Sequence, residues 1–171
     1  MDNTVIETSR LILRPMEAGD FAKLYEIFSD AETMKYYPAP FDKERVKSWI
    51  TWNLTNYKSY GYGLWALILK AENQVIGDCG LIHQVVDDVR ELEIAYHVHR
   101  NYWGLGYATE GVIAVKDYGF TKVGRSKLIS LIRPENLSSC RVAEKNGMIV
   151  EKDIMKFDNR HSVYVCHKEN K

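Results

Sequence analysis

The segment Glu91 to Gly111 combines residue types suited to binding a phosphorylated ligand next to an acid–base group. Its first part, Glu91 to Val98, alternates polar and apolar residues as a strand does. A loop with Gly104 and Gly106 follows, and a helix is expected to begin near Ala108. Glycines let the backbone turn several N–H groups toward one point, and a helix start adds its positive end. The segment therefore predicts a cradle for a diphosphate.

Two glycines alone are a weak signal, because a loop that only connects a strand to a helix has the same composition. A dinucleotide-binding fold would need a third glycine and a first strand placed earlier in the chain. A P-loop would need Gly-Lys-Ser/Thr, which is absent from this sequence. The predicted cradle therefore relies on backbone amides and needs no lysine.

The overall composition argues against several classes of function. The 171 residues fit one domain, and 23 basic and 23 acidic residues give a formal net charge of +0, which disfavours nucleic-acid binding. Three cysteines without tight spacing and five scattered histidines predict neither a disulfide framework nor a metal site. We see no signal peptide and no membrane-spanning run, and expect a cytoplasmic protein without a membrane partner.

The periodicity along the chain predicts a mixed α/β sheet with helices on its faces. The expected strands cover residues 10–14, 64–69, 74–82, 91–98, 127–133, 149–157 and 161–167. One helix is expected to begin after Asp20, the candidate N-cap, and a second after Asp42. A third is expected over 107–122, and a fourth from about Asn136 to Asn146-Gly147. These elements must bring the glycine-bearing loop and the strand before it to one site.

Three ordered motifs resemble the GNAT (Gcn5-related N-acetyltransferase) superfamily. Asn101-Tyr102-Trp103-Gly104-Leu105-Gly106 is similar to its Gln/Arg-x-x-Gly-x-Gly/Ala signature, with Asn101 at the usual Gln or Arg. Tyr102 to Glu110 looks like the branch that contains the ribosomal-protein alanine/serine N-acetyltransferases. Thr8 to Arg14 and Glu135 to Gly147 are similar to the first strand and last helix of the same branch. The resemblance runs from about Thr8 to His167.

The resemblance implies one N-acetyltransferase domain over residues 1–171, with its core at about 8–167. The central sheet would have about six to seven mostly antiparallel strands and about four flanking helices, and would be splayed between the fourth and fifth strands. Acetyl-CoA would be the cofactor, with coenzyme A as product and no metal. The partner would be an amine acceptor, not a nucleic acid, and the protein a monomer or homodimer.

The resemblance also assigns cofactor contacts along the chain. Backbone groups at the end of the fourth strand would pair with the pantetheine amides, the loop and helix start would hold the pyrophosphate, and an asparagine would bind the pantetheine arm or cap its own helix. The residues concerned are Tyr96, His97 and Val98, then Trp103, Gly104, Leu105, Gly106, Tyr107, Ala108 and Thr109, and finally Asn136.

The implied chemistry is direct attack of an amine on the acetyl thioester, which needs a base for the ammonium proton. Glu93 is the first choice for this base, with Glu91 or a water as rivals and a salt-bridged surface role as the alternative. His97 titrates in a suitable range but lies about 13 Å from Glu93 at ~3.3 Å per residue, so we interpret it as structural. Ser139 is the candidate acid for the thiolate, since Ala143 stands where other branches have a tyrosine.

The acceptor groove is expected around aromatic residues that precede and begin the second helix. Tyr36, Tyr37 and Trp52 are candidates, Trp49 is interpreted as core, and Asp158 in the last hairpin would attract an ammonium. The first hypothesis is a protein or peptide N-terminal α-amine as acceptor, such as that of a ribosomal protein. The alternatives are a small-molecule amine (polyamine, antibiotic or metabolite), a non-catalytic acetyl-CoA-binding module, and a structural domain without a ligand.

Overall fold

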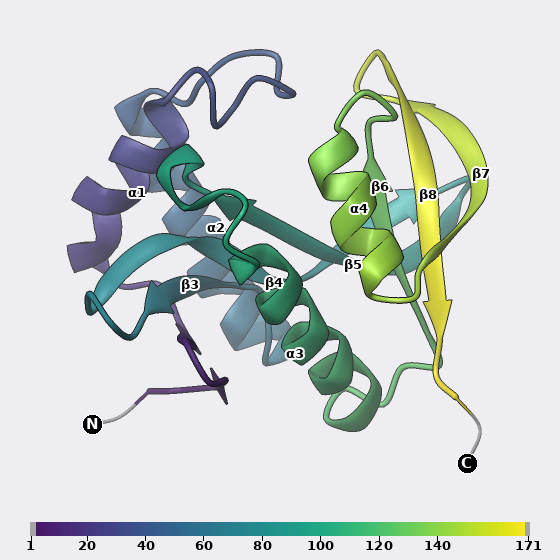
Figure 1. Cartoon of the computed structure of the whole chain (residues 1–171), viewed down its shortest axis with the longest axis horizontal. Coiled ribbons are helices and arrows are strands. Elements are labelled where there is room, and N and C mark those ends of the chain that lie inside the picture. The colour runs from purple at the N-terminus through teal and green to yellow at the C-terminus, as the bar shows by residue number, and fades with distance from the viewer. Residues whose placement is uncertain (1–2, 170–171) are drawn as a thin grey trace.

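A computed structural model of the protein describes residues 3–169 (Figure 1). The helices are α1 (Phe21–Ser29), α2 (Lys43–Tyr60), α3 (Tyr107–Thr121) and α4 (Leu137–Lys145), with short 3₁₀ turns at Ala18–Asp20 and Arg100–Tyr102. The strands are β1 (Ile6–Glu7), β2 (Leu11–Arg14), β3 (Leu64–Leu69), β4 (Gln74–Val86), β5 (Val89–Val98), β6 (Lys127–Ile132), β7 (Ile149–Lys156) and β8 (Asn159–His167).

The strands form one sheet in the order β1-β2-β3-β4-β5-β6-β8-β7. Neighbouring strands are antiparallel except β5 and β6, which are parallel and share the single register pair Glu93↔Ile129. Figure 1 shows the consequence: β6, β7 and β8 with α4 form one group beside β3 to β5 with α1 to α3. The predicted mixed, mostly antiparallel sheet with four helices and a splay between these two strands is confirmed. The sheet has eight strands, not six or seven, because β1 was not predicted.

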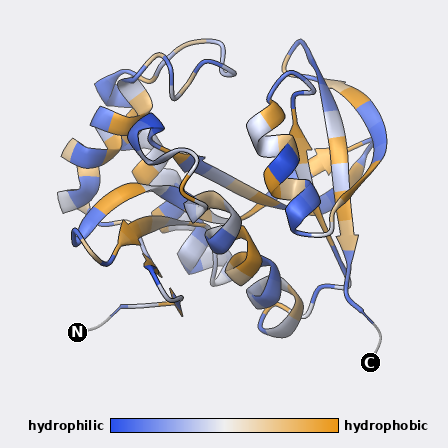
Figure 2. Cartoon of the chain, in the orientation of Figure 1, coloured by the Kyte–Doolittle hydropathy of each residue, from blue (hydrophilic) through white to orange (hydrophobic). Residues whose placement is uncertain are grey.

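Apolar side chains pack on both faces of the sheet. One cluster joins α3 and α4 to the sheet and includes Leu92, Ile94 and Val112, while the other joins α1 and α2 to it and includes Phe28 and Val46. Figure 2 shows the apolar colouring concentrated along the central strands. The alternation of apolar and polar residues along β5 therefore has the predicted effect: Leu92 and Ile94 face the side of the sheet covered by α3 and α4. The opposite face of β5 is left for polar groups.

Two local predictions need correction. The strands predicted at 74–82 and 91–98 extend to Val86 and begin at Val89, because Asp87 and Asp88 both adopt positive φ and close a tight two-residue hairpin. The Asp20 side chain does not cap α1; it accepts hydrogen bonds from the Arg14 guanidinium and from the Glu17 N–H. By contrast, α2 begins after Asp42 as predicted, and the structure adds that the Asp42 side chain caps it, accepting from the Arg45 N–H at 2.8 Å.

Candidate active site

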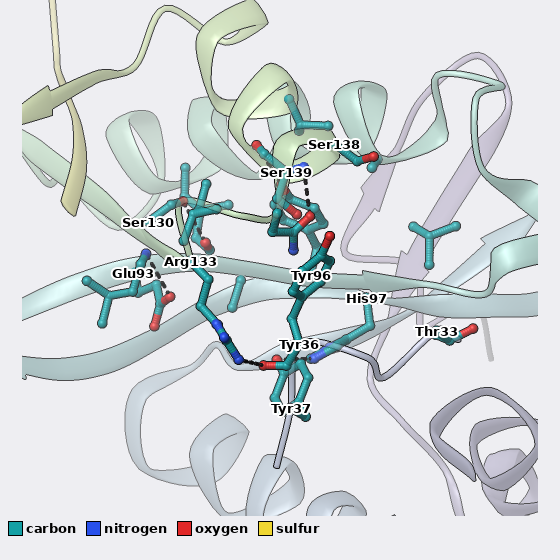
Figure 3. A pocket seen from close by; sticks show the side chains of 18 of the residues that line it. Thr33, Tyr36, Tyr37, Glu93, Tyr96, His97, Ser130, Arg133, Ser138 and Ser139 are labelled. Atoms are coloured by element: carbon teal, nitrogen blue, oxygen red, sulfur yellow. Dashed lines mark hydrogen bonds between the residues drawn. The ribbon is translucent and has the colours of Figure 1, made fainter. Parts of the chain in front are cut away.

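A cavity of about 650 Å³ lies where β5 and β6 separate. Its lining joins the 104–109 loop and helix start, the ends of β5 and β6, the start of α4, the 33–41 loop and the start of α2. Figure 3 shows part of this lining from close by, including Glu93 and Tyr96 of β5 and Ser139 of α4. The cavity therefore has one end formed by α3 and α4 and another formed by aromatic side chains before and on α2.

The 104–109 loop has the geometry of the predicted diphosphate cradle. Gly104 and Gly106 adopt φ of 75° and 82°, the left-handed region that favours glycine. The first intrahelical bond of α3 runs from the Glu110 N–H to the Gly106 carbonyl, so the N–H groups of Tyr107, Ala108 and Thr109 have no acceptor within the helix. These three residues line the cavity, and nothing lies within 4 Å of a Cβ placed on Gly104. The residues present fit a diphosphate at the positive end of a helix.

The N-terminal segment holds this loop in place, a role that the sequence patterns did not reveal. Glu110 accepts hydrogen bonds from Thr8 Oγ1, Ser9 Oγ, and the Arg10 backbone and side chain. The Arg10 guanidinium also donates to the Leu105 carbonyl at 2.9 Å and lies over the Tyr107 ring. These hydrogen bonds lower the pKa of Glu110 to about 2 against the opposing effect of its burial. Leu105 itself is 53% exposed and does not line the cavity.

The end of β5 supplies backbone to the cavity, because no residue of β5 after Glu93 pairs with β6. Tyr96, His97 and Val98 all line the cavity, as predicted for a pantetheine-binding edge. The carbonyl of Val98 accepts from the Trp103 indole at 2.7 Å. The Tyr96 hydroxyl points across the split and donates to the Ser139 carbonyl at 3.3 Å (Figure 3).

Glu93 lies at the point of separation and lines the cavity while only 6% exposed. Its carboxylate accepts from the Leu131 N–H of β6 at 3.1 Å. Burial raises the pKa of Glu93 to about 7, against smaller opposite effects that include this hydrogen bond. A carboxyl with a pKa near neutrality is suited to general-base work. Glu91, the rival, instead pairs with Lys127 at 2.9 Å and does not line the cavity.

The start of α4 contributes two of the predicted groups. Asn136 caps the helix, since its Oδ1 accepts from the Ser139 N–H at 3.2 Å. Its side-chain NH₂ is the group left to donate to a ligand. Asn136 and Ser139 both line the cavity, and Ser139 lies on the side toward Tyr96.

A buried network crosses the acceptor end, and its central carboxylate, Asp78 of β4, was missed from the sequence. Asp78 is fully buried, and its two oxygens accept from Trp49 Nε1 at 2.9 Å and pair with His97 Nδ1 at 2.7 Å. The other ring nitrogen of His97 bonds the Tyr37 hydroxyl, as Figure 3 shows. A lone aspartate within the apolar run of β4 was the available signal, because a buried carboxylate must be paired. Trp49, expected in the core, is half-buried and lines the cavity.

Of the predicted acceptor residues, three reach the cavity. Tyr36, Tyr37 and Trp52 line it, together with Phe41 and Phe157, which the sequence did not single out. The Tyr36 hydroxyl donates to the Glu135 carbonyl at 3.1 Å, so the 33–41 loop spans from α1 to the start of α4. Asp158 lies in the β7–β8 turn with positive φ, exposed and outside the cavity lining.

Within residues 3–169, no group of three or more His, Cys, Asp or Glu side chains has the arrangement of a metal site. No helix of that range has the length and apolar character needed to cross a membrane. Cys79, Cys140 and Cys166 are buried and free.

Comparison with known proteins identifies the class to which this fold and site belong. A family model described as an acetyltransferase (GNAT) domain matches residues 10–149. The chain is 40% identical over 162 residues to the uncharacterized protein YkkB of Bacillus subtilis, covering 94% of each. A GNAT-family acetyltransferase structure from Bacillus anthracis matches with a TM-score of 0.78 and 28% identity, covering 95% of this chain and 97% of that one.

A further solved structure, Mycobacterium smegmatis RimJ in complex with CoA-disulfide, matches with a TM-score of 0.75 and 19% identity. The match covers 92% of this chain and 81% of that one. The chain described here belongs to the GNAT acetyltransferase family, and it is an acyltransferase. The cradle at Gly104 to Thr109 is where the chain's own geometry fits the diphosphate of coenzyme A.

Proposed function

We propose that the enzyme transfers the acetyl group of acetyl-CoA to a primary amine by direct attack within a ternary complex, and that the acceptor is a protein or peptide N-terminal α-amine. The observation that carries this proposal is the single cavity through the β5–β6 split. One end presents backbone amides to a diphosphate, and the other presents aromatic side chains to an acceptor. Glu93 lies where the two ends meet.

In this proposal the position of each residue in the cavity determines its role. Tyr107, Ala108 and Thr109 donate backbone N–H groups to the diphosphate, and the free edge of β5 orients the pantetheine arm. Acetyl-CoA supplies the activated acetyl group. Glu93 removes a proton from the acceptor ammonium, directly or through a water, so that the neutral amine can attack. A backbone N–H of the β5 edge stabilises the oxyanion, a contribution worth ~3–4 kcal/mol in well-studied enzymes.

Ser139 is proposed as the proton donor to the departing thiolate, from its position beside Tyr96 on the cavity wall. The burial of Glu93 favours an enzyme over a module that only binds the cofactor, because a buried carboxylate with little compensation costs stability that binding alone does not require. The ribosomal type of acceptor rests on the motif resemblance at Tyr102 to Glu110. A small-molecule amine is the alternative that the same cavity accommodates.

The test is coenzyme A release measured with a thiol reagent on a panel of N-terminal peptides and small amines. The background should be low, because all three cysteines of the protein are buried. We expect release with at least one amine class and its loss in Glu93→Gln, while Glu91→Gln keeps activity. Release from peptides blocked at the N-terminus equal to that from free peptides would contradict the α-amine proposal. No release with any amine would contradict the reaction itself.

A further inference from the structure

The charges on the cavity wall are strongly unequal. Within residues 3–169 the only acidic side chain lining the cavity is Glu93. The basic side chains that line it are Arg45, Arg133, Arg141 and Lys145. Lys145 also borders a shallow hollow with Gly106 and Thr109, which places that part of α4 toward the diphosphate end. Arg45 and Arg133 lie at the acceptor end, where they contact Phe41 and the Tyr36 carbonyl.

The two arginines at the acceptor end have unused donors. The Arg45 guanidinium carbon lies 4.7 Å from the centre of the Phe41 ring, and no carboxylate of the described residues pairs with it. Arg133 donates to the Tyr36 carbonyl at 3.4 Å and lies 3.5 Å from Glu135, but its buried Nε has no partner in the described chain. Guanidinium groups left with free donors are suited to binding a carboxylate with two parallel hydrogen bonds.

No carboxylate at this end is free to receive a second cation. Glu93 serves the reacting ammonium in the proposed function, and both oxygens of Asp78 are occupied by Trp49 and His97. Glu135 lies outside the cavity lining and pairs with Arg133. Asp158 lies outside the lining. A polyamine or aminoglycoside carries further ammonium groups, which would lie beside Arg45 and Arg133 without a counter-charge.

We propose that the acceptor is an amine whose reacting ammonium is its only positive charge and which carries a carboxylate bound by Arg45. Its apolar body would lie against Trp49 and Trp52, which pack 5.2 Å apart at this end of the cavity. This inference rests on the proposed acetyl transfer to a primary amine and specifies the charges that the acceptor carries. The chemistry has two sources: a free α-amino acid, or a peptide N-terminus with an acidic side chain near its amine.

The test is equilibrium binding by calorimetry to protein saturated with coenzyme A. The small probes are L-phenylalanine, L-phenylalaninamide and spermidine, and the peptide probes are amidated tetrapeptides with Asp or Lys at the second position. We expect phenylalanine to bind roughly fivefold tighter than its amide, the upper range for a partly exposed ion pair, and spermidine to bind more weakly than either. If the acceptor is a peptide, the Asp peptide should bind more tightly than the Lys peptide. If the acceptor is a free amino acid, both peptides should bind weakly and with equal affinity.

Arg45→Glu should reverse these preferences, and Arg45→Gln should abolish them. Both variants should fold, because Glu or Gln three residues after the capping Asp42 completes a capping box. Lys47→Glu, on the same helix but outside the cavity lining, is the charge-matched control and should keep the wild-type preferences.

Tighter binding of spermidine than of both carboxylate-bearing probes, or preferences unchanged in Arg45→Glu, would overturn the inference. Failure of every carboxylate-bearing probe to bind would overturn it as well. Coenzyme A release is scored separately on the same probes. Binding with the expected charge preference but without release would sustain the inference about the site and count against the proposed reaction.

Discussion

Glu93→Gln should inactivate the enzyme and at the same time stabilise it at alkaline pH. Burial raises the pKa of Glu93 from an ordinary value of 4.5 to about 7. At about 1.4 kcal/mol per pKa unit, this difference corresponds to about 3 kcal/mol that the ionised side chain costs the folded state. Glutamine has the same shape, carries no charge, and can still accept the hydrogen bond from the Leu131 N–H. The substitution therefore removes the free-energy cost of burying the carboxylate and keeps the hydrogen bond from the Leu131 N–H.

The direction of the pH dependence follows from proton binding. Between pH 4.5 and about 7 the folded protein holds the Glu93 proton and the unfolded chain does not, so the free energy of unfolding falls as pH rises. Below this window the carboxyl is protonated in both states and costs nothing. Above about pH 7 the carboxyl is ionised in both states, and the folded protein bears the full free-energy cost of the buried charge. The variant should thus match the wild type at about pH 4.5 and exceed it by about 3 kcal/mol at about pH 8.5.

The assay is urea unfolding of both proteins across this pH range, followed by tryptophan fluorescence. Only the difference between the two proteins is interpreted, because the other carboxylates contribute equally to both. In thermal unfolding the same gain would raise Tm by roughly 2–4 °C per kcal/mol for a chain of this size. Glu91→Gln is the matched control, since Glu91 pairs with Lys127 and should show no such gain.

A stability difference that does not change with pH would refute the burial argument, as would a variant less stable than the wild type at about pH 8.5. The pH dependence of activity tests the raised pKa of Glu93 independently. In the wild type kcat/KM should rise with pH through about 7 as Glu93 ionises, and the residual activity of the variant should lack this limb.

Three further predictions concern the loop and the acceptor network. Gly106→Val places a β-branched residue at φ of 82° with its Cβ about 3.3 Å from Arg10, and should weaken coenzyme A binding measured by calorimetry while far-UV circular dichroism keeps the folded spectrum. Glu110→Gln weakens the clamp on the same loop and should lower both coenzyme A affinity and stability, the latter by about 1–3 kcal/mol in urea unfolding. Asp78→Asn should impair acceptor binding more than coenzyme A binding, and should remove the proton NMR signal of the His97 Nδ1–H bond.

Features set by neighbouring residues could be predicted from the sequence. The tight loop before α3 was predicted because glycine favours the positive φ seen at Gly104 and Gly106, and the start of α2 was predicted from the apolar spacing that follows Asp42. The Asp87-Asp88 hairpin was missed for a related reason. Its turn needs two residues with positive φ, and the sequence fills both positions with aspartate, not with the more usual Asn-Gly.

Features set by the register between distant strands could not be predicted in the same way. Asp78 meets His97 because the two are directly opposite in the β4–β5 ladder, and Tyr37 reaches His97 only because the 33–41 loop folds back over the sheet. The periodicity of a single strand gives which face a residue occupies but not which residue faces it across the ladder. Both ring nitrogens of His97 have hydrogen-bond partners, but the sequence could not name those partners.

The choice between Glu93 and Glu91 shows how one irregularity of the sheet sets several properties together. Both residues lie on the same face of β5, and their types and spacing do not separate them. Glu93 belongs to the single register pair between β5 and β6, so the strands part at its side chain and open the cavity there. The same separation leaves the Leu131 N–H without a backbone acceptor on β5, and the buried Glu93 carboxylate accepts its hydrogen bond instead. Cavity access and the hydrogen bond from the Leu131 N–H to Glu93 thus have a single structural cause, and a change that closed the splay would remove both.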